Sequence, residues 1–168
     1  TMCLVLKPKD AHTARVICDL RPLNAQYPIK PPSFSLPCLP MLMELTRSWP
    51  RVLYAKLDVS AYYHSLILPG HLLRRLSPPS CNGSHPFIFE YKGERWRWLR
   101  IPFGWSWAPA IAQKHMEVLV GTALECHPDV LFLVFYDDVL LASSDIHYLR
   151  PACKSLMSML SAVGLRAA

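Results

Sequence analysis

The sequence predicts an α+β fold in a single domain. Strand-like and helix-like segments follow one another in the mixed order strand, helix, hairpin, helix, hairpin, helix. The chain has 168 residues, of which 52% are hydrophobic, and this is enough to build one core. In addition, one aspartate lies at a predicted strand end and two more lie at a predicted hairpin.

The N-terminal part is predicted to hold two strands, a connector and a helix. Residues 2–6 and 15–20 have strand-like sequences and are separated by the polar turn KPKDAHTA. Residues 22–40 contain six prolines, so we expect this segment to be largely extended. A short amphipathic helix is predicted over 39–49, with apolar side chains at helical spacing: Leu39, Leu42, Leu45 and Trp49.

The middle of the chain is predicted to form a strand, a helical turn and a hairpin. The strand covers 53–59, with Asp58 near its end, and the helical turn follows at 61–65. The stretch FIFEYKGERWRWLRIPFG contains two β-prone runs on either side of a Lys-Gly-Glu turn. In the second run Arg95 and Arg97 alternate with Trp96 and Trp98, and we assign both tryptophans to packing.

The C-terminal part is predicted to be helix, hairpin, helix. The first helix runs from about Pro109, a favoured first helical residue, to about residue 125. Two apolar runs around the Asp137–Asp138 pair predict a second hairpin. The last helix is expected to stop at Gly164, and its apolar face comprises Leu149, Cys153, Leu156, Leu160 and Val163.

Composition limits the classes of function. The 18 Lys and Arg residues against 12 Asp and Glu residues give a net charge of +6, which favours a polyanionic partner. No C-x-x-C pair occurs that would hold zinc. The apolar runs fall short of the roughly 20 residues that a membrane helix needs, and no signal peptide opens the chain. We therefore expect an intracellular protein that does not contact membranes.

The stretch LVFYDDVLLA places two adjacent carboxylates in an apolar run. Burying a charge costs several kcal/mol unless something pairs with it. A bound cation would supply such a partner, and Asp58 would join Asp137 and Asp138 if their strands are neighbours. Magnesium prefers such oxygen ligands, and two ions about 3.5 to 4 Å apart support phosphoryl transfer.

Four segments resemble motifs of the reverse transcriptase family. VFYDDVLLA resembles the active-site hairpin, and AKLDVSAYYHSLIL resembles the other catalytic strand, in which an aromatic residue follows the aspartate by five positions. RIPFGWSWAPAIAQ resembles the family segment Pro-Phe/Gln-Gly with a later Ala/Ser-Pro-Ala and Gln, and RVICDLRPLN resembles a fingers strand. The four segments occur in the order found in the family. The sequence is similar to the enzymes of gypsy-like LTR retrotransposons, tyrosine-recombinase retrotransposons and retroviruses.

The resemblance implies a polymerase palm, which is a ferredoxin-like antiparallel sheet with helices on one face, together with fingers. We expect the fingers at about 1–28 and 66–104 and the palm at about 29–65 and 105–168. The thumb is expected to be missing, because in the family it follows the last helix. The chain would then be a fragment of a larger polyprotein, and its compartment would be the cytoplasm, the nucleus or a virus-like particle.

The resemblance also implies the chemistry: RNA-directed DNA polymerisation with two Mg²⁺ ions, or Mn²⁺ in their place. Asp58 and Asp137 would hold both ions, Val59 would lend its carbonyl, and Asp138 would complete the charge cluster. Tyr63 would exclude the 2′-hydroxyl of ribonucleotides. The full set implied to bind nucleotide is Lys7, Arg15, Ala61, Tyr62, Tyr63, Phe103, Gly104 and Gln113, and the set implied to contact primer or template is Phe135, Tyr136, Arg95 and Arg97.

The implied partners are an RNA or DNA primer-template, deoxynucleoside triphosphates and the remaining polyprotein domains, namely thumb and RNase H. An RNA-dependent RNA polymerase is an alternative that fits less well. Its paired aspartates usually follow Gly rather than Tyr136, and the position of Tyr63 is usually acidic. A second alternative is a non-catalytic retroelement remnant that binds nucleic acid.

Overall fold

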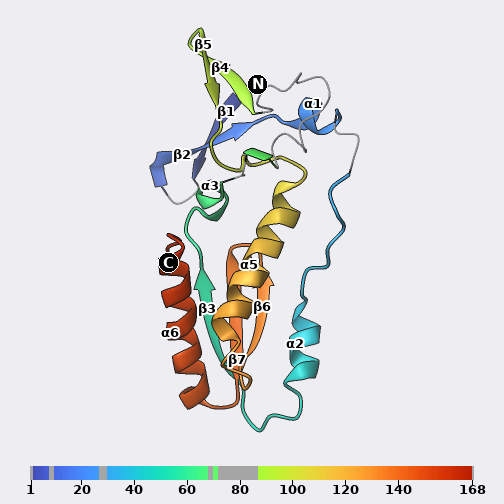
Figure 1. Cartoon of the computed structure of the whole chain (residues 1–168), viewed down its shortest axis with the longest axis vertical. Coiled ribbons are helices and arrows are strands. Elements are labelled where there is room, and N and C mark those ends of the chain that lie inside the picture. Colours follow the sequence, from blue (N-terminus) through green and yellow to red (C-terminus); the bar gives the residue numbers. More distant parts are fainter. Residues whose placement is uncertain (1, 8–9, 27–29, 68–69, 72–86, 168) are drawn as a thin grey trace. The chain divides into compact units, whose positions relative to one another are not determined.

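The chain contains helices and antiparallel strands, which confirms the α+β class (Figure 1). The computed structural model describes residues 2–7, 10–26, 30–67, 70–71 and 87–167, without the side chains of residues 2–16, 18 and 91. Two compact units are formed, one by Thr1–Pro32 with Tyr63–Ala108 and the other by Ser33–Tyr62 with Pro109–Ala168. These bounds lie close to those expected for fingers and palm, and that assignment stays a prediction.

The second unit is built around a three-stranded antiparallel sheet with the strand order β3-β7-β6. Its strands are β3 (Leu53–Asp58), β6 (Leu131–Phe135) and β7 (Asp138–Ser143). The predicted strand and the second predicted hairpin are thereby confirmed. In this register Asp138 is the partner of both Asp58 and Phe135. The aspartates of two separate sequence segments therefore meet at one end of the sheet.

The two faces of this sheet differ in character. Alternation along the strands places Leu57, Val134 and Val139 on one face, where all three are buried. Helix α6 (Ile146–Ala162) packs against β3 and β7. The opposite face carries Asp58, Asp138, Phe135 and Lys56. The acidic side chains thus lie away from the apolar layer of the sheet.

The two long helices follow their sequence signals. Helix α5 spans Ala108–Leu124, within a residue of its predicted bounds. Helix α6 begins at an N-cap aspartate, Asp145, whose carboxylate accepts a hydrogen bond of 2.8 Å from the His147 N–H. It ends before Gly164, which has φ 77° and is the predicted stop. No helix among the described residues is long and apolar enough to cross a membrane.

Helix α2 (Leu39–Leu45) is shorter than predicted, and its predicted apolar face is wrong. Only Leu42 is buried, whereas Leu39 and Leu45 are 61% and 49% exposed. At the end of the helix the Leu42 carbonyl accepts two hydrogen bonds from Thr46, one from its N–H at 3.0 Å and one from its hydroxyl at 2.9 Å.

The first unit contains two separate two-stranded sheets. β1 (Met2–Lys7) pairs with β2 (Asp10–Cys18), and β4 (Ile88–Tyr91) pairs with β5 (Glu94–Arg97). Strand β2 starts inside the predicted turn, because its residues continue the ladder with β1. Helix α1 (Arg21–Asn24) falls in the segment predicted to be extended, and it has a proline in its first turn, where a helix tolerates one. The short helix α3 (Tyr62–Ser65) matches the predicted helical turn.

The predicted β4–β5 hairpin is confirmed, but one of its packing assignments is wrong. Lys92 and Gly93 both have positive φ, 52° and 77°, as the tightest hairpin turns require. Trp98 is partly buried and its ring stacks on His64 with centroids 6.0 Å apart. Trp96, in contrast, is 50% exposed. Within the described parts of the chain β4 and β5 pair only with each other, and two strands alone cannot bury both faces of their sheet, which is why the alternation failed to predict packing.

Candidate active site

Three aspartates gather where β3 ends and β7 begins. Asp58 and Asp138 are cross-strand partners, and the Asp137 carbonyl accepts a hydrogen bond of 2.9 Å from the Val59 N–H. Although the Asp58 side chain is exposed overall, partial burial of its carboxyl raises its pKa, and the negative charges of Asp137 and Asp138 raise this pKa further. The cluster therefore concentrates negative charge that a cation would relieve.

Lys56 supplies a positive charge to this cluster. Its Nζ lies 3.0 Å from Asp138 Oδ1, and this hydrogen bond and the nearby carboxylates raise the pKa of Lys56. Lys56 precedes Asp58 by two residues and so lies on the same face of β3. No role for Lys56 was predicted, although this spacing could have indicated one.

The donor chemistry of the cluster fits a hard divalent cation. All three side chains offer carboxylate oxygens, the ligands that Mg²⁺ prefers, and the raised pKa of Asp58 reflects in part the repulsion that such an ion would remove. Over the described parts of the chain, no three His, Cys, Asp or Glu side chains converge on a single point as a finished metal site. One of the three, Asp138, is instead directed to Lys56.

The tip of the β6–β7 hairpin is formed by Tyr136 and Asp137. Tyr136 has φ 56°, a left-handed conformation that is uncommon for residues other than Gly. Its ring meets the ring of Phe135 edge-on at a centroid distance of 5.1 Å and that of Phe34 at 6.1 Å. Phe135 is 48% exposed, beside a cavity of about 240 Å³ whose lining includes Asp138 and Lys56.

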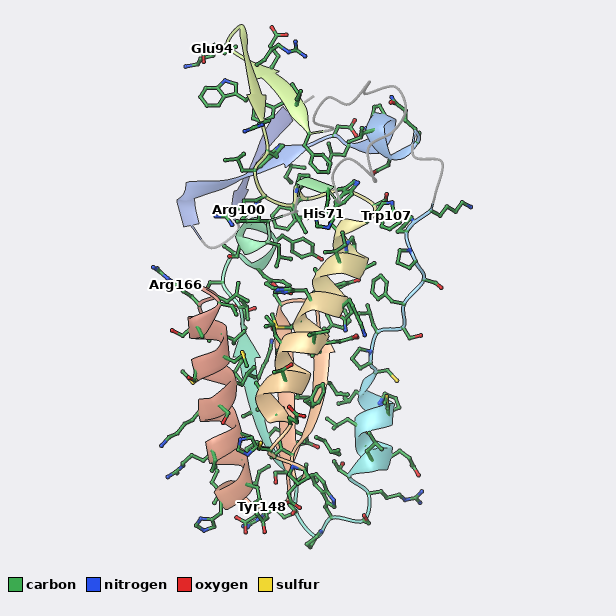
Figure 2. All side chains as sticks on the ribbon, viewed as in Figure 1. His71, Glu94, Arg100, Trp107, Tyr148 and Arg166 are labelled. Carbon is green, nitrogen blue, oxygen red and sulfur yellow. The ribbon has the colours of Figure 1, made fainter. Side chains whose placement is uncertain are left out.

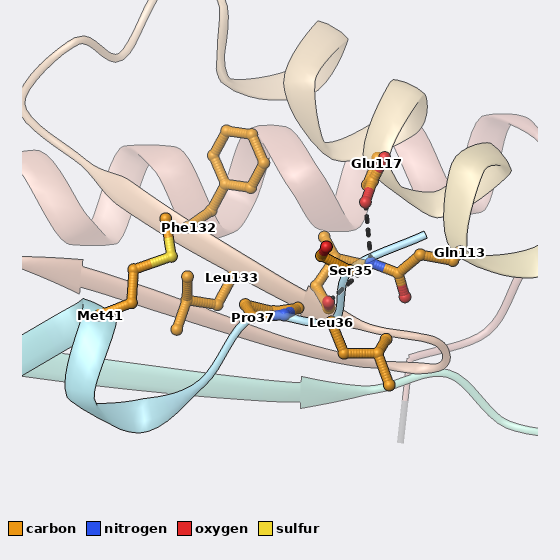
Figure 3. A pocket seen from close by; sticks show the side chains of 9 residues that line it. Ser35, Leu36, Pro37, Met41, Gln113, Glu117, Phe132 and Leu133 are labelled. Carbon is orange, nitrogen blue, oxygen red and sulfur yellow. Dashed lines mark hydrogen bonds between the residues drawn. The ribbon is translucent and has the colours of Figure 1, made fainter. Parts of the chain in front are cut away.

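Gln113 of helix α5 forms hydrogen bonds with the backbone of the β6–β7 hairpin and with Glu117, which lies next to it in Figure 3. Its amide nitrogen donates to the Val134 carbonyl at 2.8 Å and to Glu117 Oε1 at 2.9 Å, and its amide oxygen accepts from the Tyr136 N–H at 2.9 Å. Because β6 is an edge strand, the amide satisfies backbone groups that a further strand would otherwise pair. The side chain is 2% exposed, and a groove of about 410 Å³ lies beside it. Its predicted role in nucleotide binding stays a prediction.

Helix α5 also holds the segment that follows Asp58. The Tyr62 hydroxyl donates to the Ala112 carbonyl at 2.9 Å and lies 2.9 Å from His115 Nδ1. Since the hydroxyl proton points to Ala112, the His115 Nδ1 must carry the proton of the second bond. Burial lowers the pKa of His115. The resemblance implies only a nucleotide-binding role for Tyr62, and nothing in the sequence indicated this contact of its hydroxyl.

In the first unit, two residues predicted to bind nucleotide lie together. The rings of Tyr63 and Phe103 are 5.2 Å apart, and His64 meets Phe103 edge-on at 4.7 Å. Gly104 has φ 88°, and its carbonyl accepts a hydrogen bond of 2.8 Å from the Asn24 amide. The Asn24 Oδ1 in turn accepts from the Ser106 N–H at 3.0 Å. Asn24 therefore fixes the Phe103–Gly104 turn, a role that the RVICDLRPLN motif did not predict.

The other residues that the resemblance implies lie at separate positions in the structure. Arg95 and Arg97 are exposed on β5, Val59 is buried, and Ala61 has φ 52° in the turn before α3. The side chains of Lys7 and Arg15 lie outside the described residues. Within the RVICDLRPLN motif, Asp19 pairs with Arg21 at 2.8 Å, and the hydrogen bonds from Arg21 hold the pKa of Asp19 well below its usual range.

Comparison with known proteins identifies the family and relatives of this chain. Residues 5–168 match the family model for reverse transcriptase (RNA-dependent DNA polymerase). The intracisternal A-particle Pol-related polyprotein of mouse intracisternal A-particle MIA14 is 28% identical, over 100% of this chain and 18% of the relative. The transposon Tf2-3 polyprotein of Schizosaccharomyces pombe is 29% identical over 81% of the chain and 9% of the relative.

The Gag-Pol polyprotein of bovine immunodeficiency virus is 28% identical over 86% of the chain and 9% of the relative. The chain thus spans less than a fifth of the length of these relatives, all of which are polyproteins. The family model covers nearly the whole chain, and the relatives come from retroelements and a retrovirus. The chain belongs to the reverse transcriptase (RNA-dependent DNA polymerase) family.

Proposed function

We propose that this chain is the catalytic segment of a polyprotein that synthesises DNA on an RNA or DNA template, by adding deoxynucleotides to a primer 3′-OH. The observation that carries the proposal is the pairing of Asp58 with Asp138 at adjoining strand ends, with the charge of Asp137 acting on Asp58. A carboxylate cluster of this kind has no evident structural purpose, because repulsion among its charges opposes folding.

In this proposal Asp58, Asp137 and the Val59 carbonyl hold two Mg²⁺ ions, and Asp138 balances their charge. When bound, the ions would lower the pKa of the primer hydroxyl and neutralise the leaving pyrophosphate. The chain's own residues fix the geometry: the Val59–Asp137 backbone bond ties the two carboxylate-bearing segments together. Lys56 holds the Asp138 carboxylate beside them through an ion pair of 3.0 Å.

The nucleotide would be bound by the remaining residues of the predicted set. Tyr63 and Phe103 form an aromatic pair, and a ring beneath the sugar would leave no room for a 2′-hydroxyl. Ala61 adopts a left-handed conformation, which turns successive backbone N–H groups to one side as anion-binding turns do. Lys7 and Arg15 would add positive charge toward the triphosphate, and Phe135 and Tyr136 would contact the primer end.

Replacing Asp137 by Asn tests the proposal, because the change keeps side-chain volume and removes one negative charge. We expect Asp137→Asn to lose primer extension by at least about 100-fold, with little change in the free energy of unfolding. Because the chain spans a small part of its relatives, extension should be measured on a primed RNA template in a longer form of the protein. Asp129→Asn is the matched control, since Asp129 is exposed and outside the cluster.

Two outcomes would contradict the proposal. Near wild-type extension by Asp137→Asn would show that this carboxylate does not serve the reaction. A wild-type protein that binds nucleic acid and never extends a primer would instead be a non-catalytic retroelement remnant.

A further inference from the structure

The ion pair between Lys56 and Asp138 follows from the register of the palm-like sheet. In the pairing of β3 with β7, Asp58 lies directly opposite Asp138. Like charges in directly opposite positions destabilise a sheet. Lys56 is two residues before Asp58 on β3, which makes it a diagonal neighbour of Asp138, and its Nζ lies 3.0 Å from Asp138 Oδ1. Lys56 therefore offsets a repulsion that the register itself creates.

A second basic residue, Arg166, comes near this end of the sheet without pairing with the carboxylates. It is labelled in Figure 2, and its carbonyl accepts a hydrogen bond of 2.9 Å from the Ser60 N–H. Its side chain is exposed, and within the part of the chain that the structure describes it forms no ion pair. Among these residues, the cluster is thus neutralised through Lys56.

The charge of Lys56 acts on more than one carboxylate. Besides contacting Asp138, Lys56 is attracted by the negative charges of Asp58 and Asp137. An exposed pair of one lysine and one carboxylate contributes little to stability, and the Lys56 side chain is 62% exposed. Here, however, one ammonium faces three carboxylates that repel one another. Removing its charge therefore changes the electrostatics of the whole cluster.

We propose that Lys56 is the resident cation of the carboxylate cluster in the metal-free protein, and that it competes with a divalent cation for these carboxylates. This inference rests on the proposed function, in which Asp58 and Asp137 hold metal ions. An ammonium and a divalent cation about 5 Å apart repel each other by more than the thermal energy, even at the dielectric constant of water. Lys56 therefore allows the β3–β7 register to form without an ion, and it weakens the binding of an ion that arrives alone.

This competition favours an ion that arrives together with a nucleotide. Mg²⁺ is usually held by one or two carboxylates together with substrate phosphates. With Asp138 engaged by Lys56, two carboxylates remain for the ion, those of Asp58 and Asp137. The negative charge of a triphosphate would offset the repulsion between Lys56 and the ion. Lys56 is therefore a positioning residue, because it acts through Asp138 and through its charge and need not touch the reacting atoms.

The test measures binding of Mn²⁺, a spectroscopic probe in place of Mg²⁺, to the 168-residue chain by electron paramagnetic resonance of the free ion. We expect Lys56→Met to bind Mn²⁺ about fivefold to tenfold more tightly than the wild type, because a positive charge close to the ion is removed. Lys56→Gln should show the same gain, since it keeps a polar side chain and loses only the charge. In urea denaturation without metal, Lys56→Gln should unfold at a lower urea concentration than the wild type, because the repulsion among the carboxylates is no longer offset.

Two matched controls separate the charge of Lys56 from other effects. Lys56→Arg keeps the positive charge and should bind Mn²⁺ as the wild type does. Lys114→Met removes a lysine of helix α5 that is 77% exposed and pairs with Glu117 at 3.7 Å instead of with the cluster. This variant should also bind Mn²⁺ with wild-type affinity. Circular dichroism should show that every variant is folded.

Several results would overturn the inference. They are neutral Lys56 variants that bind Mn²⁺ no more tightly than the wild type, an equal gain in affinity for Lys114→Met, or a metal-free Lys56→Gln variant as resistant to urea as the wild type. Weaker Mn²⁺ binding by the neutral variants would mean that Lys56 prepares Asp138 for the ion instead of competing with it. If the neutral variants bind Mn²⁺ as the wild type does while Asp137→Asn abolishes primer extension, only this inference fails. If they gain Mn²⁺ affinity while no form of the protein extends a primer, the inference stands and the polymerase proposal fails.

Discussion

Replacing Gln113 by Met should loosen the hairpin that carries Asp137 and Asp138. Met has nearly the same length as Gln and lacks the amide that bonds to Val134, Glu117 and Tyr136. Each such hydrogen bond contributes about 1 kcal/mol net, and a buried group left unpaired costs more. Because Gln113 is 2% exposed, water cannot readily replace the amide. We therefore expect a loss of about 3 kcal/mol in the free energy of unfolding.

The assay is urea denaturation of the 168-residue chain followed by circular dichroism, with primer extension measured on the longer form. Glu117→Gln is the matched control, since its side-chain carbonyl can still accept the bond from Gln113. That variant should lose less than about 1 kcal/mol. The extension rate of the Met variant should fall together with its stability, because Tyr136 would no longer be held at positive φ.

A nucleotide-binding role for Gln113 predicts the opposite pattern. The KM for deoxynucleotides would then rise while the free energy of unfolding stayed the same. A Met variant within about 0.5 kcal/mol of the wild type would refute the reasoning from the three hydrogen bonds.

Three further predictions follow from the structure and the family. Tyr63→Val should admit ribonucleotides, because it removes the ring that lies against Phe103, and an unchanged ribo-to-deoxy ratio in primer extension would make Tyr63 a packing residue. Burial lowers the pKa of His115 in the folded chain, so the unfolded chain binds a proton at His115 more readily. The stability that neutral His115 contributes is therefore present above about pH 6.5 and is lost as the pH falls through the folded-state pKa. Urea denaturation at about pH 7.5 and about pH 5.5 should show a smaller drop in the free energy of unfolding on acidification for His115→Gln than for the wild type. An equal drop would show that His115 does not cause it; burial also lowers the pKa of His64, which both proteins retain. Residues 1–168 alone should extend a primer poorly compared with a longer form at equal concentration and low salt, because few contacts to the duplex are made; equal, processive synthesis would show that the chain is self-sufficient.

The elements that the sequence predicted correctly are those whose patterns arise from burial. β3, β6 and β7 have apolar runs, helix α6 has an apolar face over a sheet, and Gly164 marks its end. Each pattern reflects the layer against which the element packs, so sequence spacing is a faithful guide. The convergence of Asp58 and Asp138 could also be predicted, because each lies at one end of an apolar strand and the two strands are neighbours in one sheet.

The failures occur where no such layer exists. Strand β5 has the alternation of a half-buried strand, yet Trp96 is exposed, because among the described residues β5 pairs with β4 alone. Helix α2 has leucines at helical spacing, but of its residues only Leu42 is buried. Alternation and helical spacing describe which residues share a face, and they do not indicate whether anything covers that face.

The contacts that position the proposed catalytic residues come from a helix that carries no carboxylate of the cluster. Over four successive residues, α5 accepts the Tyr62 hydroxyl at Ala112, holds Tyr136 through Gln113, and meets Tyr62 again at His115. One of these tyrosines follows Asp58 by four residues and the other immediately precedes Asp137. Because both contacts originate on one rigid element, a shift of α5 would move both segments together, whereas loss of one contact would change the separation of the carboxylates. The spacing between Asp58 and Asp137 therefore depends on Gln113 and His115 of α5, whose contacts with Tyr136 and Tyr62 the sequence did not indicate.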